Sequence, residues 1–131
     1  MKTKRFEDLI AWQKARELFR IVQEITGKAP IKSNYPVRDQ MTRAALSIMS
    51  NIAEGFDRGG DKEFVQYLYI SKGSFSELRS QLYAGRDAGY LKQADFDAAF
   101  ELAEETSKII QGLLNSIKSR SLKGRKFQAS P

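Results

Sequence analysis

The stretch Asp39–Arg58, DQMTRAALSIMSNIAEGFDR, decides the fold. Its apolar residues recur at steps of three and four, the spacing that places side chains on one face of an α-helix. With Val37, which precedes it, the apolar face comprises Met41, Ala44, Ala45, Ile48, Met49, Ile52, Ala53 and Phe56. A face this broad cannot be buried against a single neighbour. The stretch therefore predicts a helix that packs against more than one partner.

Three other segments have helical periodicity. Together with the central stretch, whose helix is expected over 36–54, they predict four helices. The other three are expected over 6–26, from a cap at Asp61 to Gly89, and from 93–95 to 117. Gly27, Pro30, Gly55 and the Gly59–Gly60 pair suit the breaks between them. Phe64, Leu68, Ser71, Phe75, Leu78, Leu82, Gly85 and Gly89 give the third segment a seven-residue repeat.

These segments predict an all-α protein, an antiparallel up-down-up-down four-helix bundle. The expected organisation is a basic N-terminal arm over 1–5, the bundle over 6–117 and a basic, disordered tail over 118–131. In this topology both arms and the turn at Arg58 share one end of the bundle.

The composition excludes several classes of function. The 131 residues include no cysteine and no histidine, which removes thiol nucleophiles, imidazole bases and the usual zinc ligands. No run approaches the roughly 18 to 20 apolar residues of a membrane span, and the charged N-terminus lacks a signal-peptide core. We therefore expect an intracellular, cytoplasmic protein without a cofactor or a metal.

The net charge of +6 is unevenly distributed. The two ends carry eight bases and no acid; removing these from the 22 bases leaves 14 against 16 acids in the body. The basic residues of the ends are Lys2, Lys4, Arg5, Lys118, Arg120, Lys123, Arg125 and Lys126. Clustered lysine and arginine bind phosphates without sequence specificity, although such arms also serve solubility.

Three motifs carry a resemblance to a known family. They are Phe6-x-x-Leu9-x-x-Trp12-Gln13-Lys14-Ala15, then Gln40-x-x-Arg43-Ala44-Ala45-x-Ser47-Ile48-x-x-Asn51-Ile52-Ala53-Glu54-Gly55, and Ile70-x-x-Gly73-Ser74-x-x-Glu77-Leu78. Over Phe6 to about Ile117 the chain resembles the 23S rRNA intervening-sequence proteins. Ser71 is a departure, since the family more often has alanine there.

The resemblance implies a left-handed four-helix bundle and a ring of five subunits. It also implies kinship to the accessory proteins of diversity-generating retroelements, basic pentamers that work with a reverse transcriptase and nucleic acid. The family has no established catalytic activity. A ring of five would multiply the eight charges of the ends to 40, enough to steer an anionic polymer.

A polar row runs beside the apolar face of the central stretch. If the second and third helices are antiparallel about Arg58, Arg43 lies beside Ser74 and one turn from Glu77. We expect Arg43, Ser47, Asn51, Ser74 and Glu77 to form a buried polar network that fixes the helix register. A catalytic or ligand-binding carboxylate is the alternative for Glu77.

Other candidate sites have simpler explanations. Glu54, Asp57, Asp61 and Glu63 lack calcium-loop spacing, so capping and solvation explain them better than a metal does. The nearby glycines match neither a dinucleotide fingerprint nor a Walker motif. Trp12, Tyr67, Tyr69, Tyr83 and Tyr90 could stack on bases, but core or interface roles are commoner on helices. Tyr69 and Tyr83 are predicted interface residues.

The predicted function is a non-enzymatic oligomeric scaffold that binds RNA, or an RNA–protein complex, through a basic pole. Its predicted nucleic-acid-binding residues are the eight bases of the ends together with Arg58. One alternative is a protein–protein assembly module without a nucleic-acid role. A carboxylate enzyme using Glu54 or Glu77 is another.

Overall fold

The computed structural model describes the backbone of residues 3–129 and the side chains of residues 3–122. Within this part the chain is all-α, with four α-helices and no strand. They are α1 (Ile10–Thr26), α2 (Tyr35–Asp57), α3 (Asp61–Asp87) and α4 (Gln93–Ala129), and two short 3-10 helices, η1 (Phe6–Asp8) and η2 (Ile31–Ser33), precede α1 and α2. The prediction of an all-α chain with four helices is confirmed.

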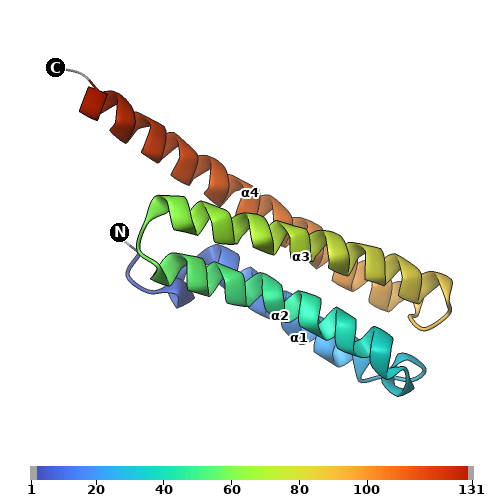
Figure 1. Ribbon diagram of the computed structural model, residues 1–131. Helices are drawn as coiled ribbons and strands as arrows, with labels where there is room; N and C mark the ends of the chain where they lie inside the picture. The colour runs from blue at the N-terminus through green and yellow to red at the C-terminus, as the bar shows by residue number, and fades with distance from the viewer. Residues whose placement is uncertain (1–2, 130–131) are drawn as a thin grey trace.

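Pairs of side chains far apart in sequence fix how the helices run. Ser47 of α2 bonds Ser74 of α3, and Glu54 bonds Tyr67, so the residue number falls on one helix as it rises on the other. Two ion pairs relate α4 in the same sense to α1 and the residues just after it, Lys14–Glu105 and Lys28–Asp95. The ion pair Arg79–Glu104 joins α3 to α4. Consecutive helices are therefore neighbours, and α4 returns beside α1 (Figure 1).

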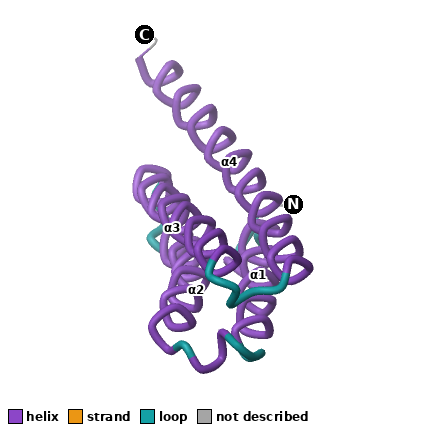
Figure 2. The backbone as a smooth tube through the Cα atoms, turned by 90° about the vertical axis from the view of Figure 1, so that its right-hand side faces the viewer, coloured by secondary structure: helices purple, strands orange, loops and turns teal. Residues whose placement is uncertain are grey.

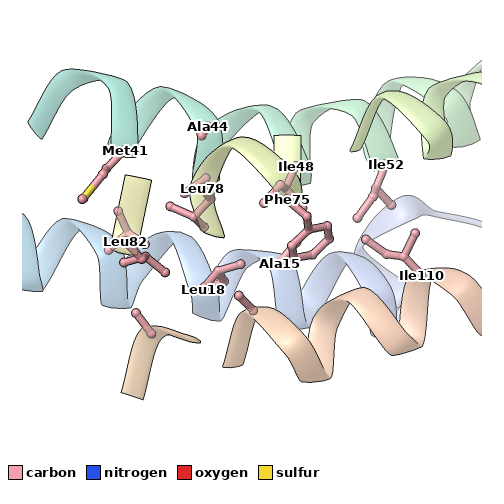
Figure 3. Close-up of a cluster of buried hydrophobic side chains, with 14 of the residues drawn as sticks. Ala15, Leu18, Met41, Ala44, Ile48, Ile52, Phe75, Leu78, Leu82 and Ile110 are labelled. Carbon is pink, nitrogen blue, oxygen red and sulfur yellow. The ribbon is translucent and has the colours of Figure 1, made fainter. Parts of the chain in front are cut away.

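The expected apolar face of α2 forms the centre of the core. Met41, Ala44, Ala45, Ile48 and Ile52 are buried, while Val37, Met49 and Phe56 are partly buried against them. Figure 3 shows Ile48 near Phe75 and Leu78 of α3, with Ala15 and Leu18 of α1 opposite. The apolar face of α2 is thus buried against both α1 and α3. Burying each leucine-sized side chain stabilises the fold by roughly 1.5 to 3 kcal/mol.

Local sequence explains the helix boundaries. The side chain of Asn34 accepts a hydrogen bond from the backbone of Val37, and Pro36 lies in the first turn of α2 as expected. Gly59 and Gly89 have φ of +85° and +79°, the left-handed region that favours glycine, and they form the turns after α2 and α3.

The start of the first helix is a correction. The regular helix begins at Ile10, because Leu9 has an extended backbone and residues 6–8 form a separate 3-10 turn. The Phe6 ring packs edge-on against Trp12 at 5.2 Å, and Gln13 donates a hydrogen bond to the Glu7 carbonyl. These contacts fold the N-terminal segment back onto α1.

The fourth helix also differs from the prediction. It begins at Gln93, which places Asp95 in its first turn, and it continues to Ala129 where a disordered tail was expected from residue 118. The sequence from 118 to 129 is rich in good helix formers and has no proline before Pro131. Residues 1–2 and 130–131 lie outside the described residues.

The helices leave both described ends and the α2–α3 turn at one end of the bundle, which we call the basic pole (Figure 1). Figure 2 shows α4 projecting beyond the other helices at this end. Within the described part of the chain, no helix has an apolar stretch long enough to cross a membrane.

Candidate nucleic-acid interface and polar contacts

The predicted polar row divides into two groups. Asn51 donates hydrogen bonds to the Ser47 carbonyl at 2.8 Å and to the Ser47 hydroxyl at 3.0 Å, and the Ser74 hydroxyl donates to the Ser47 hydroxyl at 2.9 Å. Ser47, Asn51 and Ser74 are therefore connected across α2 and α3. A further hydrogen bond joins the same two helices: the buried Ser71 hydroxyl of α3 donates to the Ile48 carbonyl of α2 at 2.9 Å.

Arg43 and Glu77 lie outside this network, which corrects their predicted burial. The Arg43 side chain is 78% exposed and its Nε lies 3.0 Å from Asp39 Oδ2 on the same helix. Glu77 is exposed as well. Both line an open groove of about 420 Å³ with Gln40, Ala44, Ser47 and Gln81.

The helix register explains the difference. Ser74 was expected beside Arg43, but it bonds Ser47, one helical turn further along α2. Helix α2 runs to Asp57 and the turn occupies residues 58–60, so the turn is not symmetrical about Arg58. Ser71, which departs from the family pattern, thereby obtains a buried partner.

At the basic pole, three predicted phosphate-binding arginines already contact carboxylates. Arg120 donates two hydrogen bonds to Asp61, at 2.8 and 3.2 Å. Arg5 pairs with Glu7, and Arg58 donates to Glu54 at 3.0 Å. A phosphate that binds these guanidinium groups must compete with the carboxylates.

Glu54 has two donors on one oxygen. The hydrogen bond from Arg58, followed by a second from the Tyr67 hydroxyl, holds the pKa of Glu54 below its usual value. The guanidinium of Arg58 also lies 5.4 Å from the centre of the Tyr67 ring. These two hydrogen bonds join Glu54 to Arg58 at the end of α2 and to Tyr67 of α3.

The predicted lysines are less encumbered, as far as the structure describes them. Lys4 is exposed. The Lys118 ammonium lies 4.7 Å from the centre of the Tyr69 ring and donates to the Tyr69 hydroxyl. The backbone of Lys123, Arg125 and Lys126 continues α4, their side chains are outside the described part, and Lys2 is outside the described residues altogether.

The two predicted interface tyrosines lie on the exposed side of α3. Tyr69 is 45% and Tyr83 is 43% exposed. Tyr69 contacts Lys118 and also Lys72, whose ammonium is 5.9 Å from the ring centre. Tyr83 packs against Phe96 and Phe100 of α4 at 5.3 and 5.2 Å, which accounts for the covered part of its ring. Their role in an interface stays a prediction.

Sequence reasoning missed an aromatic–guanidinium cluster between α3 and α4. The guanidinium of Arg86 lies 5.2 Å from the Tyr83 ring centre and 4.5 Å from that of Phe96, and Arg79 lies 5.5 Å from Phe100. Aromatic and basic residues spaced by three and four were the available signal. Among the side chains described, no group of three or more acidic residues could hold a metal ion.

The fold and these contacts define a helical-bundle protein with a charged pole. Comparison with known families then gives a closer identification, because the family described as "23S rRNA-intervening sequence protein" matches residues 7–112. The chain belongs to this family.

Known structures agree on the fold. A crystal structure described as a protein with unknown function from the S23 ribosomal protein family, from Bacteroides thetaiotaomicron VPI-5482, is similar, with a TM-score of 0.74 and 19% identity. The match covers 81% of this chain and 96% of that one. No curated protein matches the chain.

Proposed function

We propose that the protein is a non-enzymatic, oligomeric scaffold that binds RNA, or an RNA–protein complex, through the basic pole. The observation that carries the proposal is that two basic segments, the N-terminal segment and the projecting part of α4, meet at the end of the bundle where the α2–α3 turn with Arg58 lies (Figure 1). The family description names the 23S rRNA, and we therefore propose RNA as the first polyanion to test.

The contacts at the pole refine which residues would bind phosphate. Arg120, Arg58 and Arg5 are offset by carboxylates, so Lys4, Lys118 and the three bases of residues 123–126 would carry most of the affinity. Each phosphate that a lysine or arginine neutralises releases counterions, which makes the binding steeply salt-dependent.

Assembly would strengthen this interaction. We propose an up-down-up-down bundle assembled as a ring of five, in which the exposed Tyr69 and Tyr83 contact neighbouring subunits. Such a ring would repeat the basic pole five times and raise the local potential for an anionic polymer. By family kinship, a reverse transcriptase is a candidate protein partner.

A second candidate function is a protein–protein assembly module without a nucleic-acid role. The observation that favours it is the set of large apolar side chains left exposed on α2 and α3: Tyr35, Leu46, Tyr69, Ile70 and Tyr83. In that case the charges would serve solubility only.

Two measurements on the purified protein distinguish these functions. Fluorescence anisotropy with labelled single-stranded RNA and DNA of equal length should show binding at low salt that is tighter for RNA. Light scattering should give the mass of a pentamer. An absence of RNA binding at low salt would contradict the RNA scaffold, and a monomer would contradict the ring.

A further inference from the structure

A small groove lies where α4 leaves the bundle. It has a volume of about 400 Å³ and lies between the start of α3 and the part of α4 beside it. Its lining residues are Asp61, Lys62, Val65, Gln66, Lys118, Ser121 and Leu122. The volume suits a few large side chains of a partner and is too small for a folded domain.

The groove combines an apolar floor with a basic rim. Val65 is partly buried and Leu122 is 56% exposed, so both present apolar surface to a partner. Lys62 and Lys118 border the same groove, and the charge of Asp61 is offset by its two hydrogen bonds from Arg120. A partner that fits must bury apolar groups and place acidic groups beside the lysines.

The course of α4 indicates a helical partner. The Arg120–Asp61 pair joins α4 to the first residue of α3, yet α4 continues to Ala129. Figures 1 and 2 show that this last part of α4 projects without a neighbouring helix. A short helix without tertiary packing is marginally stable in water, so a helix laid along the groove and α4 would supply the missing packing.

We infer that this groove binds an acidic amphipathic helix of a partner protein, with leucine-like side chains over Val65 and Leu122 and carboxylates beside Lys62 and Lys118. This surface goes beyond the RNA-binding function, because an apolar floor adds nothing to phosphate binding, while helix-in-groove recognition uses apolar anchors at helical spacing. Lys118 belongs to both surfaces, so the two functions are separated by substitution of the apolar Leu122 and not by substitution of Lys118.

The test uses a labelled peptide of about 14 residues with leucines at helical spacing and glutamates on the flanks. Two comparison peptides have the same composition in scrambled order, or lysine in place of glutamate. Anisotropy titration of the full chain should show tight binding of the first peptide only. If the scrambled peptide binds equally well, charge alone accounts for peptide binding and the inference is overturned. An absence of binding by the ordered peptide would overturn it as well.

Protein variants locate the binding site. Leu122→Ser should weaken binding of the ordered peptide about tenfold, since it removes an apolar contact without changing charge. Leu46→Ser is the matched control, because Leu46 is 44% exposed on α2, and it should leave the affinity within about twofold. Equal losses in both variants would contradict the assignment to this groove.

A second groove variant shows whether a loss of peptide binding comes from misfolding. RNA affinity, measured on the same variants, shows whether peptide binding and RNA binding use different residues. Lys62→Gln should weaken the peptide several-fold, while circular dichroism should show an intact bundle. Leu122→Ser should leave RNA affinity within about twofold, because the charge is unchanged. A loss of RNA binding equal to the loss of peptide binding would assign the groove to RNA and overturn the inference.

Discussion

The guanidinium of Arg120 holds the carboxylate of Asp61 through two hydrogen bonds, at 2.8 and 3.2 Å, and so joins α4 to the first residue of α3. Arg58 is held by one hydrogen bond to Glu54, four residues earlier at the end of α2. Two of the guanidinium groups expected to bind phosphate are thus neutralised within the chain. Substitutions that remove the carboxylate partners of these guanidinium groups test directly whether the basic pole binds phosphate.

Asp61→Asn should increase affinity for RNA, because it frees Arg120 and removes a carboxylate that repels phosphate. Exposed ion pairs are worth about 0.2 to 1 kcal/mol, so a gain of roughly 1.4- to fivefold is expected at low salt. Asp97→Asn, near the opposite end of α4, makes the same change in charge and should have a smaller effect. Weaker RNA binding by Asp61→Asn would contradict phosphate binding near Arg120.

Gly55→Ala and Gly73→Ala should have effects of opposite sign. A Cβ at Gly55 would lie 2.6 Å from Tyr67 Cβ and 3.1 Å from Phe64 Cδ1, whereas nothing lies within 4 Å of a Cβ at Gly73. Overpacking at Gly55 should cost about 1 to 3 kcal/mol, and the better helix propensity of alanine should stabilise Gly73→Ala by about 0.5 to 1 kcal/mol. Urea unfolding measures both. Similar effects of the two substitutions would contradict the close α2–α3 contact.

The periodicity of the apolar residues was sufficient to predict the helices and their buried faces. The pairing of α2 with α3 was predicted one turn away from its position, because the number of residues in the turn does not fix how far two helices slide past each other. Ser47 therefore meets Ser74 where Arg43 was expected. Arg43 consequently remains on the surface with Asp39.

Ser71→Ala should destabilise the bundle by about 1 kcal/mol, because it removes the donor to the buried Ile48 carbonyl. Ser76→Ala is the control on the same helix, since the exposed Ser76 hydroxyl reaches only the Lys72 carbonyl at 3.5 Å. Both changes gain the same helix propensity. Thermal unfolding should separate the two variants, and equal stability would show that the Ser71 hydrogen bond contributes nothing.

The hydrogen bond from Arg58 lowers the pKa of Glu54 more than the hydrogen bond from Tyr67 does. A carboxyl with a lowered pKa stabilises the fold above its unfolded pKa, and this contribution is lost as the pH falls through the folded value. Arg58→Gln should therefore raise the Glu54 midpoint more than Tyr67→Phe does, as measured by carboxyl NMR.

The control for this titration is Tyr90→Phe, in the turn between α3 and α4 at the opposite end of the bundle, which should leave the Glu54 midpoint unchanged. The reverse ranking, with Tyr67→Phe having the larger effect, would show that the Arg58 hydrogen bond is weaker in solution than the geometry indicates.

The candidate site was less predictable than the fold. Residue type identified the bases of the pole, but the carboxylate partners of Arg58 and Arg120 depend on side-chain geometry at the turn and at the α3–α4 contact. The continuation of α4 beyond Ile117 was missed because a charged segment without apolar periodicity looks like a tail, whereas its helix propensity favours a helix.

The most direct test of the RNA-binding pole is the salt dependence of RNA affinity for two charge-matched variants. One replaces Lys118, Lys123, Arg125 and Lys126 with glutamine, and the other replaces Lys28, Lys32, Arg38 and Lys92, which lie toward the opposite end of the bundle. The slope of log K against log salt should become shallower by about 0.7 for each phosphate of the single strand that the variant no longer neutralises. A clearly smaller slope for the first variant, with a near-normal slope for the second, is the expected result. Equal slopes for both variants would contradict RNA binding at the basic pole.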